Sequence, residues 1–138
     1  MNHATIRAAR TAFATLALAL GTVLGTALPA HAHGDNHSHE PQHGGMVTEV
    51  GDIDYELVLR PDVATLHVRD HGRIANTEGA SARLTLLSGS TKTEASLTPA
   101  GAGMLQAKGS FPVAAGTKAV VLVNLPGRKA ANMRFAVK

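Results

Sequence analysis

Four histidines lie close together near the N-terminal end of this 138-residue chain, which contains no cysteine. They are His33, His37, His39 and His43, in the spacing H-x3-H-x-H-x3-H, flanked by Asp35 and Glu40. Neutral imidazole is the commonest protein ligand of zinc and copper(II), and a polar segment can gather several imidazoles around one ion. Without thiolates, copper(II) or zinc(II) is favoured over copper(I). We predict that these histidines bind metal; the alternative is a solvated leader with incidental histidines.

Two further histidines, His67 and His71, form a second candidate metal site. His67 is expected on the solvent face of a strand and His71 in the turn that follows, with Asp70 between them. Such a pair can supply two or three ligands, although exposed histidines at a strand end are also ordinary. A row of acidic residues, Asp52, Asp54 and Glu56, is interpreted as a solvated strand face rather than a cation site.

No catalytic motif occurs in the sequence. It lacks a G-x-S-x-G elbow, an H-E-x-x-H helix and a phosphate-binding loop, so we predict that the protein is not an enzyme. It also lacks a run of lysines and arginines, and aromatic residues make up only 3% of the chain. Nucleic-acid binding, which needs a basic face and stacking aromatics, is not expected.

The first 32 residues have the three parts of a secretory signal peptide. Arg7 and Arg10 precede an apolar stretch over 13–28, and Ala30-His31-Ala32 fits a signal peptidase site. Cleavage after Ala32 predicts a periplasmic protein with no stable membrane anchor. The new α-amine of His33 would then join its own imidazole in chelating copper(II). The loss of two of the 13 basic residues, against ten acidic ones, leaves the mature chain nearly neutral.

The rest of the chain alternates short β-like runs with turn signals and shows no sustained helical period. Strands are predicted near 46–50, 53–60, 64–69, 80–87, 91–97, 104–108, 117–125 and 131–137. Seven or eight strands at this spacing predict an all-β fold, an antiparallel β-sandwich of immunoglobulin-like type. The predicted organisation is a signal peptide at 1–32, a flexible His-rich segment at 33–45 and a β-sandwich domain at 46–138.

Alternation along each strand predicts which side chains face the core. Ile53, Tyr55 and Leu57 fall on one side of their strand, and Asp54 and Glu56 fall on the other. The run 119–123 is apolar at every position, which predicts a central strand covered on both faces.

The stretch from His43 onward resembles the small β-domain at the N-terminus of periplasmic adaptor subunits in heavy-metal efflux pumps of the RND type. The resemblance rests mainly on turn and core residues and covers nearly all of the chain after the signal. Its motifs are His43-Gly44-Gly45-Met-Val, Gly51-Asp52, Glu56-Leu57-Val58, Val68-Arg-Asp-His71, residues 82–89, Leu97-Thr-Pro-Ala-Gly101, Lys108-Gly-Ser-Phe111 and Leu125-Pro-Gly127.

This resemblance implies a role in handling copper, zinc or a related ion in the periplasm. His43 and His71 match positions where the family also has histidine, whereas Asp54 stands where relatives often carry one. The function expected is that of a metal chaperone or buffer in heavy-metal homeostasis or efflux. The alternative is a non-catalytic interaction module that docks on an efflux adaptor or another envelope partner.

Overall fold

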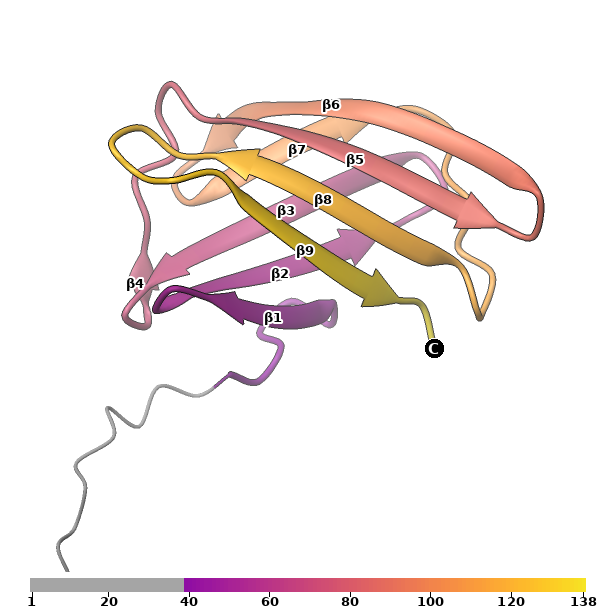
Figure 1. Ribbon diagram of the computed structural model, residues 1–138, viewed down its shortest axis with the longest axis horizontal. Helices are drawn as coiled ribbons and strands as arrows, with labels where there is room; N and C mark the ends of the chain where they lie inside the picture. The colour runs from indigo at the N-terminus through magenta and orange to yellow at the C-terminus, as the bar shows by residue number, and fades with distance from the viewer. Residues whose placement is uncertain (1–38) are drawn as a thin grey trace, which may run out of the picture. The chain divides into compact units, whose positions relative to one another are not determined.

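The computed structural model describes residues 39–138, which form nine β-strands and no helix (Figure 1). The strands are β1 (Met46–Val50), β2 (Ile53–Leu59), β3 (Val63–Asp70), β4 (Arg73–Ile74), β5 (Ser81–Ser88), β6 (Thr91–Gly101), β7 (Met104–Lys108), β8 (Lys118–Asn124) and β9 (Ala131–Ala136). Within this range no helix could cross a bilayer. The predicted signal peptide lies outside the described residues, as do His33 and His37.

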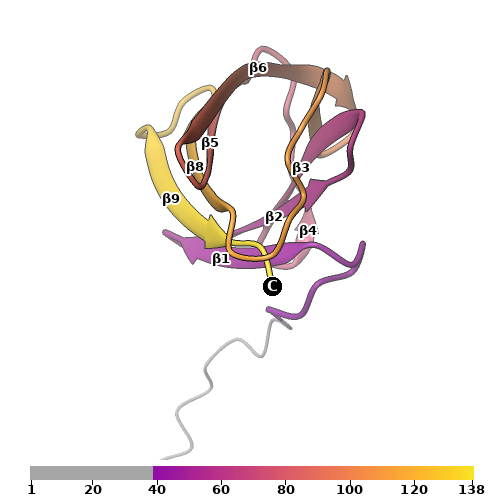
Figure 2. The same cartoon turned by 90° about the vertical axis from the view of Figure 1, so that its right-hand side faces the viewer.

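All strand pairs are antiparallel and belong to one sheet with the order β1-β2-β3-β7-β6-β5-β8-β9, while β4 pairs only with β3. Strand β6 holds the two halves together, because its residues up to Leu97 pair with β5 and those from Thr98 onward pair with β7. The sheet curves until β1 and β9 lie side by side, so that it is nearly closed into a barrel (Figure 2). The predicted all-β, antiparallel class is confirmed.

Period-two alternation fills the interior as the sequence predicted. Leu57, Leu66, Leu84, Leu105 and Val121 are completely buried and belong to one core cluster. Strands β2, β3, β5, β8 and β9 contribute every second residue to this cluster, because successive side chains of a strand point to opposite faces. The curved sheet therefore encloses a single apolar core.

Strand β8 does not have the two covered faces that its sequence predicted. Val121 and Val123 are completely buried, but Val120 is only partly buried and Leu122 keeps 40% of its surface exposed. The reason lies in the architecture. A curved sheet around one core has an outer face, and no described element covers this face over β8.

Tight turns fix the register of the strands that carry the polar side chains. Gly51 and Asp52 join β1 to β2 with φ values of 57° and 62°, as in the hairpin turn that matches the twist of its strands. This turn pairs Glu49 of β1 directly with Asp54 of β2. His71 and Gly72, with φ values of 49° and 75°, make the corresponding turn after β3.

Candidate metal site

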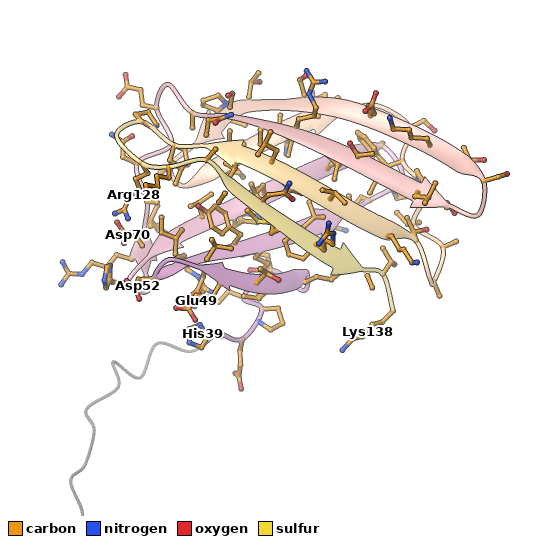
Figure 3. All side chains as sticks on the ribbon, viewed as in Figure 1. His39, Glu49, Asp52, Asp70, Arg128 and Lys138 are labelled. Atoms are coloured by element: carbon orange, nitrogen blue, oxygen red, sulfur yellow. The ribbon has the colours of Figure 1, made fainter. Side chains whose placement is uncertain are left out.

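Three side chains that offer metal ligands converge where the His-rich segment meets the β1–β2 hairpin. His39 Nδ1 lies 2.8 Å from Asp54 Oδ1, and His39 Nε2 lies 3.5 Å from Glu49 Oε2. One ligand atom of each residue lies within 4.8 Å of the others. Figure 3 shows the His39 and Glu49 side chains next to each other beneath β1. Within residues 39–138 no other such group of three occurs.

The hairpin register explains why a cation is favoured at this point. Glu49 and Asp54 are directly opposite each other on neighbouring strands, where two like charges repel. His39 lies between them. Its hydrogen bond to Asp54, together with the negative charges of Asp54 and Glu49, raises the pKa of His39. Partial desolvation and the positive charge of Arg69 act in the opposite direction but are outweighed. The two carboxylates thus favour a proton on His39 in the metal-free protein. A divalent ion can replace that proton.

The orientation of the His39 ring suits a metal ion bound at Nε2. A histidine ligand commonly donates its other ring N–H to a carboxylate, which fixes the ring and makes it a stronger ligand. Asp54 is placed to accept this hydrogen bond from Nδ1, and its side chain is only 4% exposed. Two ligand atoms of a tetrahedral zinc ion are about 3.4 Å apart. The 3.5 Å between His39 Nε2 and Glu49 Oε2 matches this spacing.

Arg69 supports the site from the neighbouring strand β3, where it is the register partner of Asp54. Its guanidinium Nη2 lies 3.8 Å from Asp54 Oδ2 and donates a hydrogen bond of 3.3 Å to the backbone carbonyl of Glu40. The arginine side chain is only 7% exposed, so the carboxylate of Asp54, and not solvent, balances its positive charge. Arg69 thus forms an ion pair with the second oxygen of Asp54, and its hydrogen bond to Glu40 attaches the His-rich segment to β3.

A second carboxylate of β2, that of Glu56, holds the following residues of the same segment. The backbone N–H groups of Gln42, His43 and Gly45 donate to Glu56 at 3.0, 2.7 and 2.9 Å, and His43 Nδ1 lies 2.9 Å from the same carboxylate. Burial alone would raise the pKa of Glu56, but these four hydrogen bonds outweigh it and lower the pKa from 4.5 to about 2. Glu56 is therefore the ionised anchor of residues 42–45.

The ring of His43 stacks on that of His67, with centroids 3.6 Å apart and an angle of 1° between the planes. Burial, and secondarily the neighbouring His43, lowers the pKa of His67. Ligand lone pairs lie in the ring plane, so two parallel stacked rings direct them within two separate, parallel planes. In this arrangement His43 and His67 do not converge on one ion.

The structure does not bring His67 and His71 together either. His67 pairs with Glu56 inside the β2–β3 ladder, whereas His71 follows the end of β3 and its backbone N–H donates to the Asp52 carbonyl. His71 Nδ1 instead lies 2.6 Å from Asp70 Oδ1, and Arg128 pairs with the other oxygen of that carboxylate. Among the predicted ligands that the structure describes, His39 alone belongs to a group of three.

The predicted solvated acidic row is wrong for two of its three members. Asp52 is exposed in the turn, but Asp54 and Glu56 are 3% and 1% exposed. Residues 39–45 cover this face of β2 and bond to both carboxylates. Gly45 allows the close approach, because a Cβ at this position would lie 2.5 Å from the carbonyl oxygen of Leu57.

Sequence reasoning did not identify Glu49, Asp54, Glu56 or Arg69 as parts of a site. The available signal was the Gly44-Gly45 pair directly after His43, since glycine often marks close contact between two backbones. Combined with the alternating acids of β2, this pair could have suggested that the segment lies on that strand.

Comparisons with protein families, curated proteins and solved structures gave no match to this chain.

Proposed function

We propose that this chain is an exported, periplasmic transition-metal-binding protein that buffers or delivers copper(II) or zinc(II). The observation that carries the proposal is the pairing of His39 Nε2 with Glu49 at ligand spacing, with Asp54 behind the ring. An imidazole and a carboxylate suit zinc and copper(II), whereas calcium prefers six to eight oxygens. We also propose that the chain is related to the N-terminal domains of efflux adaptors and shares their immunoglobulin-like sandwich class.

The site supplies too few ligands to enclose an ion, which is consistent with a protein that exchanges its metal. His39 and Glu49 provide two ligands, or three if Asp54 turns from His39 to the ion. A structural zinc site normally has four protein ligands, whereas an open site leaves positions for water or for an incoming ligand. In the proposed function, His33 and His37 supply further imidazoles.

Calorimetric titration of the metal-stripped, exported protein with zinc and copper(II) tests the proposal, after mass spectrometry has identified the N-terminus. We expect one strong site, with at least tenfold weaker binding after His39→Ala or Glu49→Gln. Affinity should fall from pH 7.5 to pH 5, because protons compete with the metal for imidazole.

Glu78→Gln is the matched control, because this exposed carboxylate follows β4 in the sequence and does not belong to the group of His39, Glu49 and Asp54. It should leave the affinity unchanged. Binding that persists at full strength after the loss of both His39 and Glu49 would contradict the proposed site.

A further inference from the structure

The outer face of β5, β8 and β9 has a surface chemistry that the metal site does not explain. These strands lie side by side across the front of Figure 1, and their outward positions are solvent-exposed or partly exposed. Together with the adjoining edge of β6 we call this the basic face, defined by Arg83, Lys92, Lys118, Arg134, Leu87 and Leu122. All four of its cations are exposed.

The cations alternate with apolar side chains in cross-strand rows. Leu87 lies between Lys92 and Lys118 on the neighbouring strands, and Arg83 lies beside Leu122. Leu87 and Leu122 keep 44% and 40% of their surfaces exposed. A hollow of about 620 Å³ opens at one end of the face, with Leu87 and Val120 among its apolar lining and Lys118 and Arg134 among its charged lining.

One acidic residue, Glu94, points outward beside these cations. Lys92 Nζ lies 3.0 Å from its carboxylate, and this pairing, with Arg83 nearby, lowers the pKa of Glu94. Acidic and basic residues are also unevenly distributed along the described chain. Residues 39–74 contain seven acidic and three basic side chains, whereas residues 75–138 contain two acidic and eight basic ones. The basic face carries four of these eight basic side chains.

We propose that the basic face docks on the surface of an anionic phospholipid bilayer. Its cations lie against lipid phosphates, while Leu87 and Leu122 reach the boundary between headgroups and acyl chains. Long basic side chains suit this position, because their aliphatic stems cover apolar surface while the charges stay in the polar layer. Each cation near an anionic membrane adds to the attraction, and together they give reversible, salt-sensitive binding.

The same observations disfavour an acidic protein segment as the occupant. Strands β5 and β8 are interior strands paired on both sides, so they present no free edge to which a peptide strand could add. Protein interfaces are usually anchored by aromatic side chains, yet Tyr55, Phe111 and Phe135, all the aromatics of residues 39–138, are buried. A diffuse array of charge with shallow apolar positions fits a uniform anionic surface better.

Flotation with lipid vesicles tests the docking. The probes are vesicles of phosphatidylglycerol mixed with phosphatidylcholine, and vesicles of phosphatidylcholine alone. We expect the exported protein, without the predicted signal peptide, to float with the anionic vesicles at 0.05 M salt and to be released at about 0.5 M, where screening is strong. The double variant Lys118→Glu/Arg134→Glu should bind more than tenfold more weakly. Leu87→Ser/Leu122→Ser should also weaken binding, by a smaller factor.

The matched control is Arg60→Glu/Arg73→Glu, which makes the same change in net charge at two exposed arginines outside the basic face. It should bind nearly as well as the unchanged protein, and equal loss in both double variants would overturn the proposal. So would failure to float with anionic vesicles, or complete competition by millimolar glycerol phosphate. Tighter, face-dependent binding to a polyglutamate peptide would assign the face to an acidic protein partner instead.

Discussion

The two sides of this curved sheet use the same strand pattern and carry opposite outer surfaces. On β1 and β2 the outward carboxylates of Glu49, Asp54 and Glu56 meet residues 39–45, and two of the three are buried. On β5, β8 and β9 the outward residues are basic or apolar and remain accessible to solvent. On both sides, the alternation of apolar and polar residues along the strands determines which side chains enter the core. The outer surfaces differ because a preceding segment covers one side and, in the described chain, nothing covers the other.

The largest effect should come from removing the anchor of the covered side. Glu56→Ala leaves three backbone N–H groups and the His43 ring without their acceptor, so we expect a loss of about 4 kcal/mol in the free energy of unfolding. Urea titration followed by circular dichroism measures this loss. Glu94→Ala removes an exposed carboxylate from the uncovered side and should leave the urea midpoint nearly unchanged. Equal losses would remove the distinction between the two sides.

Acid should also destabilise the covered side of the sheet, through protonation of Glu56. The folded-state pKa of Glu56 is lowered from 4.5 to about 2, so its stabilising contribution is complete above pH 4.5 and disappears as the pH falls toward 2. The shift corresponds to about 3 kcal/mol, because each pKa unit is worth about 1.4 kcal/mol.

Urea midpoints measured between pH 2 and pH 6 test this, and Glu56→Gln is the comparison variant. It should be less stable at neutral pH and lose less stability across this interval. A pH dependence that is identical in the two proteins would assign the acid sensitivity to other carboxylates.

Close packing of the segment on β2 can be tested at Gly45. A methyl group at this position would lie 2.5 Å from the Leu57 carbonyl oxygen, so Gly45→Ala should cost about 2 kcal/mol and free residues 39–45 from the strand. Faster amide exchange at Gln42 and His43 would report that release. Gly109→Ala places its methyl 3.2 Å from the edge of the Phe111 ring, which can move, and should cost less.

The smallest effect concerns the orientation of His39. Asp54→Asn keeps the size of the side chain but weakens its hold on His39 Nδ1, so zinc should bind about tenfold more weakly, or about 1.4 kcal/mol. Calorimetry gives the affinity, and Asp62→Asn, at an exposed carboxylate before β3, is the control. Unchanged binding in Asp54→Asn would show that the ring needs no support from β2.

The sequence by itself determined the strands, the turns and the inward residues. These features are local: apolar residues at every second position, interrupted by glycine, proline and aspartate, define strand and turn within a few residues. The predicted strands near 46–50, 53–60, 91–97 and 104–108 accordingly lie close to β1, β2, β6 and β7, although β6 continues to Gly101. His39 was also identified from sequence, as one of four clustered histidines.

Only the tertiary structure decided what covers each outer face. The period of a strand separates two faces but does not say which of them meets water, so Asp54 and Glu56 looked solvated and β8 looked enclosed. Residue 39 meets residue 54, and residue 43 stacks on residue 67, through folding of the segment back onto the sheet. Glu49 joins His39 through the hairpin register. Contacts between separate segments depend on the path of the whole chain, which no short sequence pattern encodes.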